Sequence, residues 1–319
     1  IYTAMLVQTL ETGGKRGARA AEAEAGKALV EAEYQKRRRE LLEKASSYFV
    51  NALAAKEALA LADRELELAE NGLSSVETQV EAGRATVSQR QLAAMAVGEA
   101  KLEQRRSRRG LERALAELAT LWGGAGKASQ VKGSLTAPAG ELPARPPLLA
   151  ALENHPELRV ARLRGEQATA RMKMAQAGRY PDVELGVGAR HDRGSGDDAL
   201  VVGLSVPLPL FESGRDAVRA ARAEARAAEI AVQSTRLDLR QRFEAAWNAY
   251  ADGHDAAITV EQELMPAARE VFSDIDQSYR LGRTTFLEWV EARRQLDTAN
   301  RRWLAARRDF QQAAATLQA

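Results

Sequence analysis

Two acidic side chains, Glu288 and Glu291, are the residues whose type and spacing could act on a charged solute. They are three positions apart, which places both carboxylates on one face of a helix. Paired carboxylates on one face can attract cations to a passage. An ordinary solvated helix face has the same spacing, so the residues alone leave both interpretations open.

Metal-binding and catalytic chemistry find little support in the sequence. The histidines are His155, His191 and His254, which fall in three distant segments, and there is no cysteine. No group of histidines and carboxylates has the spacing of a metal site, and no nucleophile motif or phosphate-binding loop is present. We therefore expect no metal site, no cofactor and no enzymatic activity.

The composition excludes other classes of protein. The formal net charge of the 319 residues is +2, which argues against a general nucleic-acid binder. Local runs such as Arg37–Arg39 and Arg105–Arg109 are more typical of the solvated face of a helix. The sequence has no apolar run of the length that a transmembrane helix needs, and no signal peptide. It opens in the middle of a pattern, so we expect an N-terminal part to precede Ile1.

A short stretch that occurs twice indicates how the helices around Glu288 and Glu291 are arranged. Val80–Val87 and Tyr279–Phe286 each place Gly-Arg-x-Thr between two helical patterns, and the glycines Gly83 and Gly282 are 199 residues apart. Glycine adopts the positive φ that ends a helix without a Cβ clash. Each stretch therefore predicts the tip of a helical hairpin.

The helix that enters the first tip is predicted to be very long. Apolar residues recur at two heptad positions without a polar interruption from Leu41 to Val80, a pattern typical of supercoiled helices. A helix from Lys15 to Ala82 would span roughly 100 Å at 1.5 Å per residue. A solvated coiled-coil rod is the simpler alternative. The return helix is expected over 88–122, and Pro266 should kink the second long helix.

Three segments alternate in the manner of β-strands. They are residues 3–10, 182–191 and 199–208, and the last two form a hairpin with a polar turn over 192–198. About ten residues per strand is the length that a tilted membrane strand needs. A hairpin on a soluble domain would alternate in the same way, but there are too few strands here to build a soluble sheet beside such long helices.

The chain thus divides into six segments that form two repeats. They are a strand segment (1–12), a first helical hairpin (13–122), a linker (123–155), a helix (156–181), a strand hairpin (182–210) and a second helical hairpin (211–319). The junction Phe211–Arg215 matches Glu11–Lys15 in the first repeat. The first repeat lacks the leading helix and strand of the second, so we expect those elements to precede Ile1.

This duplicated pattern resembles the TolC-type outer-membrane efflux proteins, and most closely their CzcC-like heavy-metal branch. The similarity covers essentially the whole chain and rests on Gln8–Arg16, Asn154–Leu158 and the two tips. It implies a mainly α fold with membrane β-strands. Three protomers would complete a 12-stranded β-barrel in the outer-membrane lipid, and long antiparallel coiled-coil hairpins would continue it as an α-barrel.

The resemblance also implies a function and partners. The protein would be the outer-membrane channel of a tripartite RND-type efflux system in a Gram-negative cell, extending into the periplasm. It would be a passive duct for heavy-metal cations, and it would work as a homotrimer with a periplasmic membrane-fusion adaptor and an inner-membrane RND pump. The alternative function is a periplasmic coiled-coil adaptor or scaffold, although an adaptor would carry one hairpin rather than two.

The hairpin tips are the candidate adaptor contact, because apolar groups at Val87, Phe286 and Leu287 would stand at an otherwise exposed end. A tight turn that merely requires glycine is the competing explanation. The candidate contact residues are Gly83, Arg84, Thr86, Val87, Gly282, Arg283, Thr285, Phe286 and Leu287.

Near the second tip, the resemblance assigns a periplasmic gate to Tyr279, Glu288 and Glu291. The arginine of the family's closing network would fall at Thr284, and Gln89 stands where the first repeat usually has an acidic partner. The familiar network is therefore not fully reproduced. We hypothesise that Glu288 and Glu291 form a threefold acidic ring that favours cations and weakens the closed state.

Overall fold

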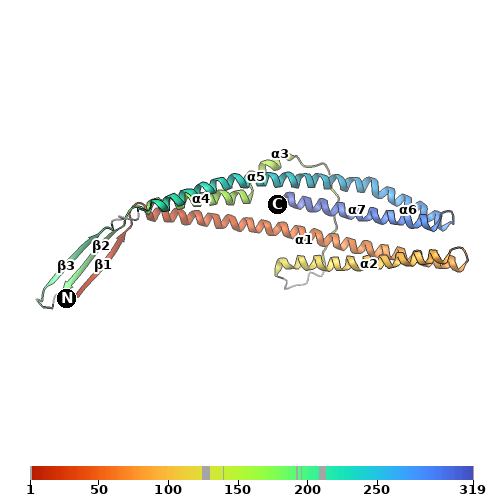
Figure 1. Cartoon of the computed structure of the whole chain (residues 1–319), viewed down its shortest axis with the longest axis horizontal. Coiled ribbons are helices and arrows are strands. Elements are labelled where there is room, and N and C mark those ends of the chain that lie inside the picture. The colour runs from red at the N-terminus through yellow and green to blue at the C-terminus, as the bar shows by residue number, and fades with distance from the viewer. Residues whose placement is uncertain are drawn as a thin grey trace. The chain divides into compact units, whose positions relative to one another are not determined.

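The computed structural model shows three β-strands and a set of long helices (Figure 1). It describes residues 2–123, 130–138, 140–191, 193–194, 196–207 and 213–318. The strands are β1 (Tyr2–Leu10), β2 (Val183–His191) and β3 (Asp198–Ser205). The helices are α1 (Lys15–Glu81), α2 (Val87–Ala119), α3 (Arg145–Ala151), α4 (Pro156–Ala177), α5 (Arg215–Thr259), α6 (Met265–Arg280) and α7 (Phe286–Gln318).

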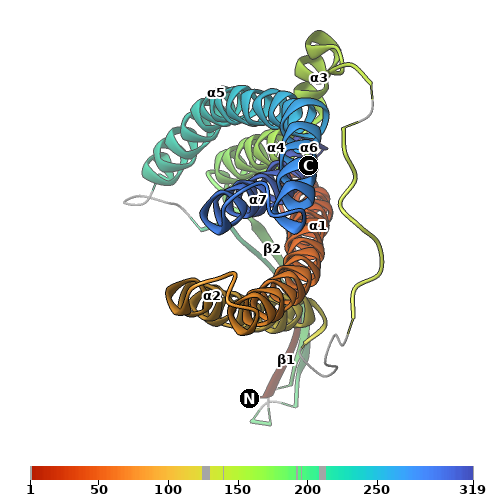
Figure 2. The same cartoon turned by 90° about the vertical axis from the view of Figure 1, so that its right-hand side faces the viewer.

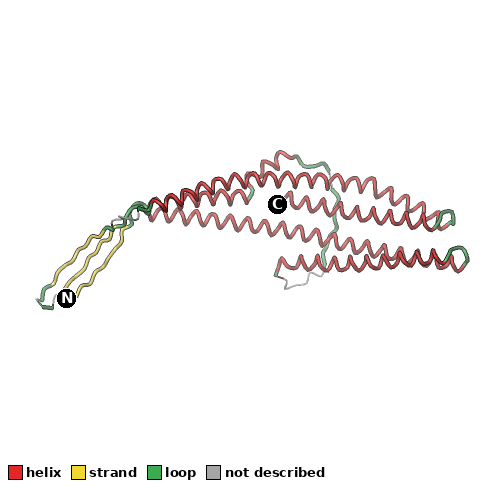
Figure 3. Tube along the Cα trace, viewed as in Figure 1, coloured by secondary structure: helices red, strands yellow, loops and turns green. Residues whose placement is uncertain are grey.

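The predicted elements agree with these bounds to within a few residues, and Figure 3 shows their order along the trace. Three short turns complete them: 3₁₀ turns η1 (Thr120–Trp122) and η2 (Leu152–Asn154), and a π-helical turn η3 (Val260–Leu264). Parts of the predicted linker, of the polar turn, of the end of the third strand and of the Phe211–Arg215 junction lie outside the described residues. No helix within the described ranges is both long and apolar enough to cross a bilayer.

The chain divides into two compact units that cut across the helical hairpins. Unit 1 comprises residues 1–38 and 145–241, and unit 2 comprises residues 39–144 and 242–319. The helices α1 and α5 each run through both units, whereas both hairpin tips belong to unit 2. Each unit is therefore described by itself.

In unit 1, the described strands form one antiparallel sheet in the order β1-β2-β3. The register places Leu6 opposite Val187, and Val187 opposite Val202. Because side chains alternate across a strand, these residues share one face of the sheet. The face is apolar except for Gln8 and a few polar residues at the end that carries Tyr2. Its apolar members are Ala4, Leu6, Leu10, Val183, Leu185, Val187, Ala189, Leu200, Val202 and Leu204.

The opposite face of the sheet carries several glycines and is mixed in polarity. Glu184 and Arg190 lie on it, and Gly186, Gly188 and Gly203 bring its surface close to the backbone. Met5 covers these glycines, since a Cβ at Gly186 would lie 2.7 Å from the Met5 methyl carbon. The sheet therefore has one strongly apolar face and one face that mixes glycine and polar residues with Met5, Val7 and Val201.

The junction between β1 and α1 is held by Asp182, the residue before β2. Its carboxylate accepts a hydrogen bond from the Thr12 amide at 3.1 Å and from the Lys15 ammonium at 2.7 Å. The glycines Gly13 and Gly14 have positive φ values of 64° and 74°, which turn the chain from strand into helix. Asp182 thus fixes the first helix against the second repeat.

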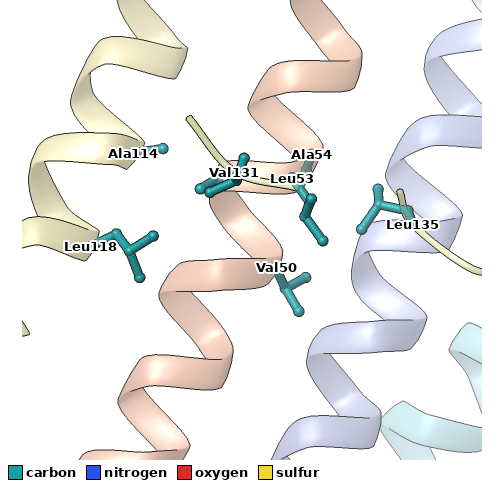
Figure 4. Packing of buried hydrophobic residues seen from close by; sticks show 8 residues of the cluster. Val50, Leu53, Ala54, Ala114, Leu118, Val131 and Leu135 are labelled. Carbon is teal, nitrogen blue, oxygen red and sulfur yellow. The ribbon is translucent and has the colours of Figure 1, made fainter. Parts of the chain in front are cut away.

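In unit 2, an extended segment over residues 130–138 binds α1 to α7. Leu135 is 1% exposed and packs in a core cluster with Leu53 and Leu118 (Figure 4). Its amide donates to the Glu57 carboxylate at 2.7 Å, and its carbonyl accepts from the Arg307 guanidinium at 3.0 Å. The segment therefore contributes to the core although it has no regular structure.

The second long helix is interrupted by η3, which ends two residues before Pro266. The carboxylate of Glu261 in this turn accepts hydrogen bonds from the Trp303 indole at 2.6 Å and the Arg307 guanidinium at 2.7 Å. Proline cannot donate the backbone hydrogen bond that a regular helix needs at that point. The predicted disturbance at Pro266 is thus a π-helical turn, which is bound to α7.

Candidate functional site

The first hairpin tip is a glycine turn closed by a capping box. Gly83 has a φ of 69°, and the Arg84 amide donates to the Gln79 carbonyl at 2.7 Å. Thr86 caps α2, because its hydroxyl accepts from the Gln89 amide at 3.3 Å while the Gln89 side chain accepts from the Thr86 amide at 2.8 Å. These hydrogen bonds satisfy several of the backbone groups at this end of the hairpin.

The second tip repeats the same design with one change. Gly282 has a φ of 67°, and the Arg283 amide donates to the Ser278 carbonyl at 2.8 Å. Thr285 takes the place of Thr86, and Glu288 takes the place of Gln89: the Thr285 amide donates to the Glu288 carboxylate at 2.7 Å. Hydrogen bonds from the amide and the hydroxyl of Thr285 lower the pKa of Glu288.

An aromatic cluster packs behind the tips and joins the two hairpins. The rings of Tyr279, Phe286 and Trp289 lie 5.8–6.1 Å apart, measured between ring centroids. They pack with Val76 of α1 and Ala93 of α2 in one buried cluster. A Cβ added at Gly72 would lie 2.7 Å from the Trp289 ring, so α1 needs a glycine there.

This cluster corrects the prediction for Phe286. Its side chain is only 4% exposed and therefore cannot present an apolar group to a partner. It aligns with Val87 in the repeat, but the aromatic ring turns inward against Tyr279 and Trp289. The prediction that Phe286 stands exposed at the tip is wrong.

The other apolar tip residues are exposed. Val87 is 55% exposed and Leu287 is 71% exposed, and each is the first or second residue of its helix. Arg84 and Arg283 lie in the turns before them and are also exposed. The two tips therefore offer separate small surfaces that combine an apolar and a basic side chain.

The three predicted gate residues are not brought into one group. The Tyr279 hydroxyl donates to the Gln79 side chain at 3.4 Å, and burial raises the pKa of Tyr279. Glu291 binds within its own helix, where it accepts from Arg294 at 3.0 Å and from Gln295 at 3.2 Å. These hydrogen bonds lower the pKa of Glu291. Glu288 is engaged in its helix cap.

The sequence analysis missed a buried charged group between α1 and α7. Glu65 is 6% exposed and Arg293 is 8% exposed. Glu65 lies 3.4 Å from the Arg301 guanidinium, and Arg293 lies 3.8 Å from Asp297. Burial raises the pKa of both Glu65 and Asp297. Among so many charged residues, nothing in the heptad pattern distinguishes these four from a solvated face.

The structure also places the histidines. His155 caps α4 by accepting from the Glu157 amide at 3.2 Å, and His254 is buried and bound to the Gly140 carbonyl at 3.1 Å. His191 lies beside Asp198 in the sheet at 2.9 Å. In the described ranges, no three histidines or carboxylates gather as a metal site would require.

Comparison with protein families gives a match over more than half of the chain. A family model described as "Outer membrane efflux protein" matches residues 148–319. The chain is 27% identical over 319 residues to the cobalt-zinc-cadmium resistance protein CzcC of Cupriavidus metallidurans, covering 99% of this chain and 75% of that protein. It is 28% identical over 240 residues to the nickel-cobalt-cadmium resistance protein NccC of Alcaligenes xylosoxydans xylosoxydans. That match covers 74% of this chain but only 53% of NccC.

Comparison with solved structures identifies the fold. The outer-membrane channel OprN superposes with a TM-score of 0.85 at 21% identity, covering 98% of this chain and 73% of that chain. This similarity confirms the predicted TolC-like fold, mainly α with membrane β-strands. It also agrees with the two hairpins and the single sheet described above.

Proposed function

The chain belongs to the outer membrane efflux protein family, and we propose that it is the outer-membrane channel of a tripartite RND-type system that exports heavy-metal cations. It is an efflux component of the Gram-negative outer membrane that extends into the periplasm. Metal export is supported by the relatives named for resistance to cobalt, zinc, cadmium and nickel. Family membership sets aside a periplasmic adaptor as the function.

A homotrimer is proposed because one sheet cannot be stable alone in lipid. The sheet has two edges, β1 and β3, that carry unpaired backbone groups within the described residues. Such groups are costly in a bilayer, so the edges must be joined to other strands. In the proposed assembly, three protomers join their sheets edge to edge into a closed β-barrel with the apolar face toward lipid. The glycine-rich face with Glu184 and Arg190 lines the lumen.

The observation that carries the proposal is the preformed pair of exposed tips. Each turn is fixed by its glycine and capping box, so little ordering is needed when a partner binds. The adaptor would contact Arg84 and Val87 on the first tip and Arg283 and Leu287 on the second. The glycines Gly83 and Gly282 and the caps Thr86 and Thr285 shape these surfaces.

Replacement of the exposed apolar tip residues tests this function in cells. We expect Val87→Glu with Leu287→Glu to abolish metal export and capture of the membrane-fusion adaptor, because a charge replaces each apolar contact. Metal accumulation and an adaptor pull-down measure the two effects in the full-length protein. The control is Leu42→Glu, which changes another exposed leucine on α1 (58% exposed), far in sequence from either tip. Normal export by the tip variant would contradict the assignment.

The acidic residues near the second tip are proposed to favour cations at the periplasmic entrance. Each copy would contribute Glu288 and Glu291 to a threefold ring, and Tyr279 would support it from the aromatic cluster behind the tip. Glu288→Gln with Glu291→Gln should reduce the preference for cations in a planar bilayer. Because Gln89 fills the same capping position in the first tip, glutamine at position 288 should preserve the turn. Unchanged ion selectivity would reject the ring.

A further inference from the structure

An exposed face of α2 carries a cluster of arginines. Arg105, Arg109 and Arg113 are spaced by four residues, which places them along one side of the helix, and Arg106 lies beside them. All four are exposed. Arg106 lies 3.7 Å from Glu103, whereas the other three make no ion pair within the described part of the chain. We call these four residues the basic face.

An exposed face at the end of α5 and in η3 has the opposite charge. Asp252, Asp255 and Glu263 follow each other at helical spacing, with the uncharged Thr259 between them. All four are exposed. Asp255 contacts His254 at 3.1 Å, and Asp252 and Glu263 make no ion pair in the described ranges. We call these four residues the acidic face.

The two faces cannot meet within one copy of unit 2. In both views, α1 and α7 lie between α2 and the α5–α6 helix (Figures 1 and 2). Interactions run in sequence across the four helices: Gln104 of α2 binds Asp63 of α1, Glu65 of α1 pairs with Arg301 of α7, and Trp303 of α7 binds Glu261. The basic and acidic faces therefore belong to the two outer helices of this layer.

The same interactions show that the faces lie at the same level along the helices. Arg105 is next to Gln104 in sequence, and Glu263 is two residues from Glu261. Arg105 and Glu263 therefore lie at about the same distance from the hairpin tips. From there Arg113 is eight residues farther from the tip on α2, and Asp255 is eight residues farther from the tip on α5. Eight residues correspond to about 12 Å along a helix. Arg105 and Arg113 therefore have the same separation as Glu263 and Asp255.

Toward the hairpin tips, the acidic face is followed by a groove and the basic face by exposed apolar side chains. A groove of about 540 Å³ runs between α6 and α7. Its α6 side is apolar and includes Ala267 and Val271, whereas its α7 side includes Arg294 and Arg302. On α2, the exposed side chains next to the arginines on the tip side are Leu102 and Met95, which are 55% and 63% exposed. Leu102 and Met95 lie at about the same distance from the hairpin tips as the groove.

We propose that the basic face of α2 in one copy binds the acidic face of α5 and η3 in a second copy, with Leu102 entering the groove between α6 and α7. This inference rests on the trimer of the proposed function and assigns its contact in the periplasmic helices. The interface is heterologous, since different surfaces meet, and a rotation about an axis along the helices closes it into a ring. The charges determine which surfaces meet and how the two copies are aligned along the helix axes.

Cysteine cross-linking tests the contact directly, because these 319 residues contain no cysteine. Arg105→Cys with Glu263→Cys, in the full-length protein in its membrane, should shift the monomer to a covalent trimer on a denaturing gel under oxidation. The matched control, Arg105→Cys with Asp252→Cys, moves one cysteine eleven residues along α5, about 16 Å away, and should not cross-link. Either single-cysteine variant should remain a monomer.

Charge reversal provides the second test. Arg105→Glu, Arg109→Glu and Arg113→Glu together should cause loss of the trimer at low ionic strength, because two acidic faces then meet. Adding Asp252→Arg, Asp255→Arg and Glu263→Arg should restore it. Native mass spectrometry of the detergent-solubilised protein measures both.

The outcomes separate this inference from the function on which it rests. A trimer that forms without the cross-link, or that survives charge reversal, overturns the interface and leaves the channel in place. If charge reversal abolishes only adaptor binding, the basic face belongs to the adaptor and the interface is wrong. Dimers from a single cysteine would show that like surfaces meet. A wild-type protein that remains monomeric overturns both proposals.

Discussion

At the residue scale, the two tips differ in a single capping side chain. Glutamine and glutamate are both good residues at this position, because either side chain accepts a hydrogen bond from the capping threonine's amide. Only the glutamate can titrate, and its charge also interacts favourably with the positive end of the helix dipole. The second tip should therefore respond to acid, whereas the first should not respond through its cap.

Acidification should loosen the second tip. The pKa of Glu288 is lowered in the folded protein, so its contribution to stability is present above the ordinary pKa of glutamate and is lost as the pH falls through the lowered value. Glu288→Gln should remove this dependence. Hydrogen-exchange protection of the Thr285 amide at several pH values measures it, with the Thr86 amide as the internal control. Equal pH dependence in the variant and the wild type would contradict the role of this carboxylate.

The buried group between α1 and α7 should have the opposite pH dependence. Burial raises the pKa of Glu65, so the protonated form is favoured in the folded state. Its contribution to stability is full below the ordinary pKa of glutamate and is lost as the pH rises through the raised value. Wild type should therefore gain stability relative to Glu65→Gln as the pH falls from 7 to 4.

Thermal unfolding of the two proteins over this pH range measures the difference. The control is Glu77→Gln, which replaces an exposed glutamate on the same helix. A constant difference between wild type and Glu65→Gln would show that Glu65 does not change its protonation preference on folding.

At the element scale, the hairpins depend on where glycine stands. Gly83 and Gly282 have positive φ values, and no atom lies within 4 Å of a Cβ placed on either. Their replacement by alanine therefore costs only the backbone strain of the left-handed conformation, about 1–2 kcal/mol. Gly98 also has open space around it, but it lies inside α2 with a helical φ.

Alanine should therefore have opposite effects at these glycines. We expect Gly83→Ala and Gly282→Ala each to lower the free energy of unfolding by about 1–2 kcal/mol. Gly98→Ala should raise it by about 0.5–1 kcal/mol, because alanine loses less backbone entropy in a helix. Denaturant unfolding of the three variants compares them. A stabilised Gly282→Ala protein would show that the tip does not need the left-handed turn.

The tips and helix ends could be predicted because they depend on local chemistry. A glycine with positive φ, a threonine three residues before glutamine or glutamate, and a proline in the first turn of a helix each act within a few residues. The heptad repeat likewise indicated the part of α1 from Leu41 to Val80. These signals give the elements and their order.

Burial within the folded unit could not be predicted in the same way. Phe286 and Val87 occupy matching positions, yet only Phe286 is buried, because Tyr279 and Trp289 of the second hairpin form a pocket for its ring. Glu65 and Arg293 resemble any exposed pair of charges until α1 and α7 pack together. The interruption at η3 depends on Glu261 reaching α7. The charged group and the π-helical turn depend on contacts between residues 42 to more than 200 positions apart.

At the scale of the whole molecule, the same duplication serves two environments. In unit 1 the apolar face of the sheet is suited to lipid, whereas in unit 2 buried alanines and a few aromatic residues hold long helices close together. In the described residues, the sheet has two open edges, and Arg105, Arg109 and Arg113 of α2 make no ion pair. The proposed trimer would join the edges of the sheet and pair these arginines with a second copy.

The measurement that most directly tests the outer-membrane duct is electron microscopy of the full-length protein extracted from the membrane in detergent. Negative-stain images should show threefold particles with a helical barrel of roughly 100 Å, the length that a helix such as α1 spans at 1.5 Å per residue. Single rods or isolated hairpins would contradict the trimeric channel.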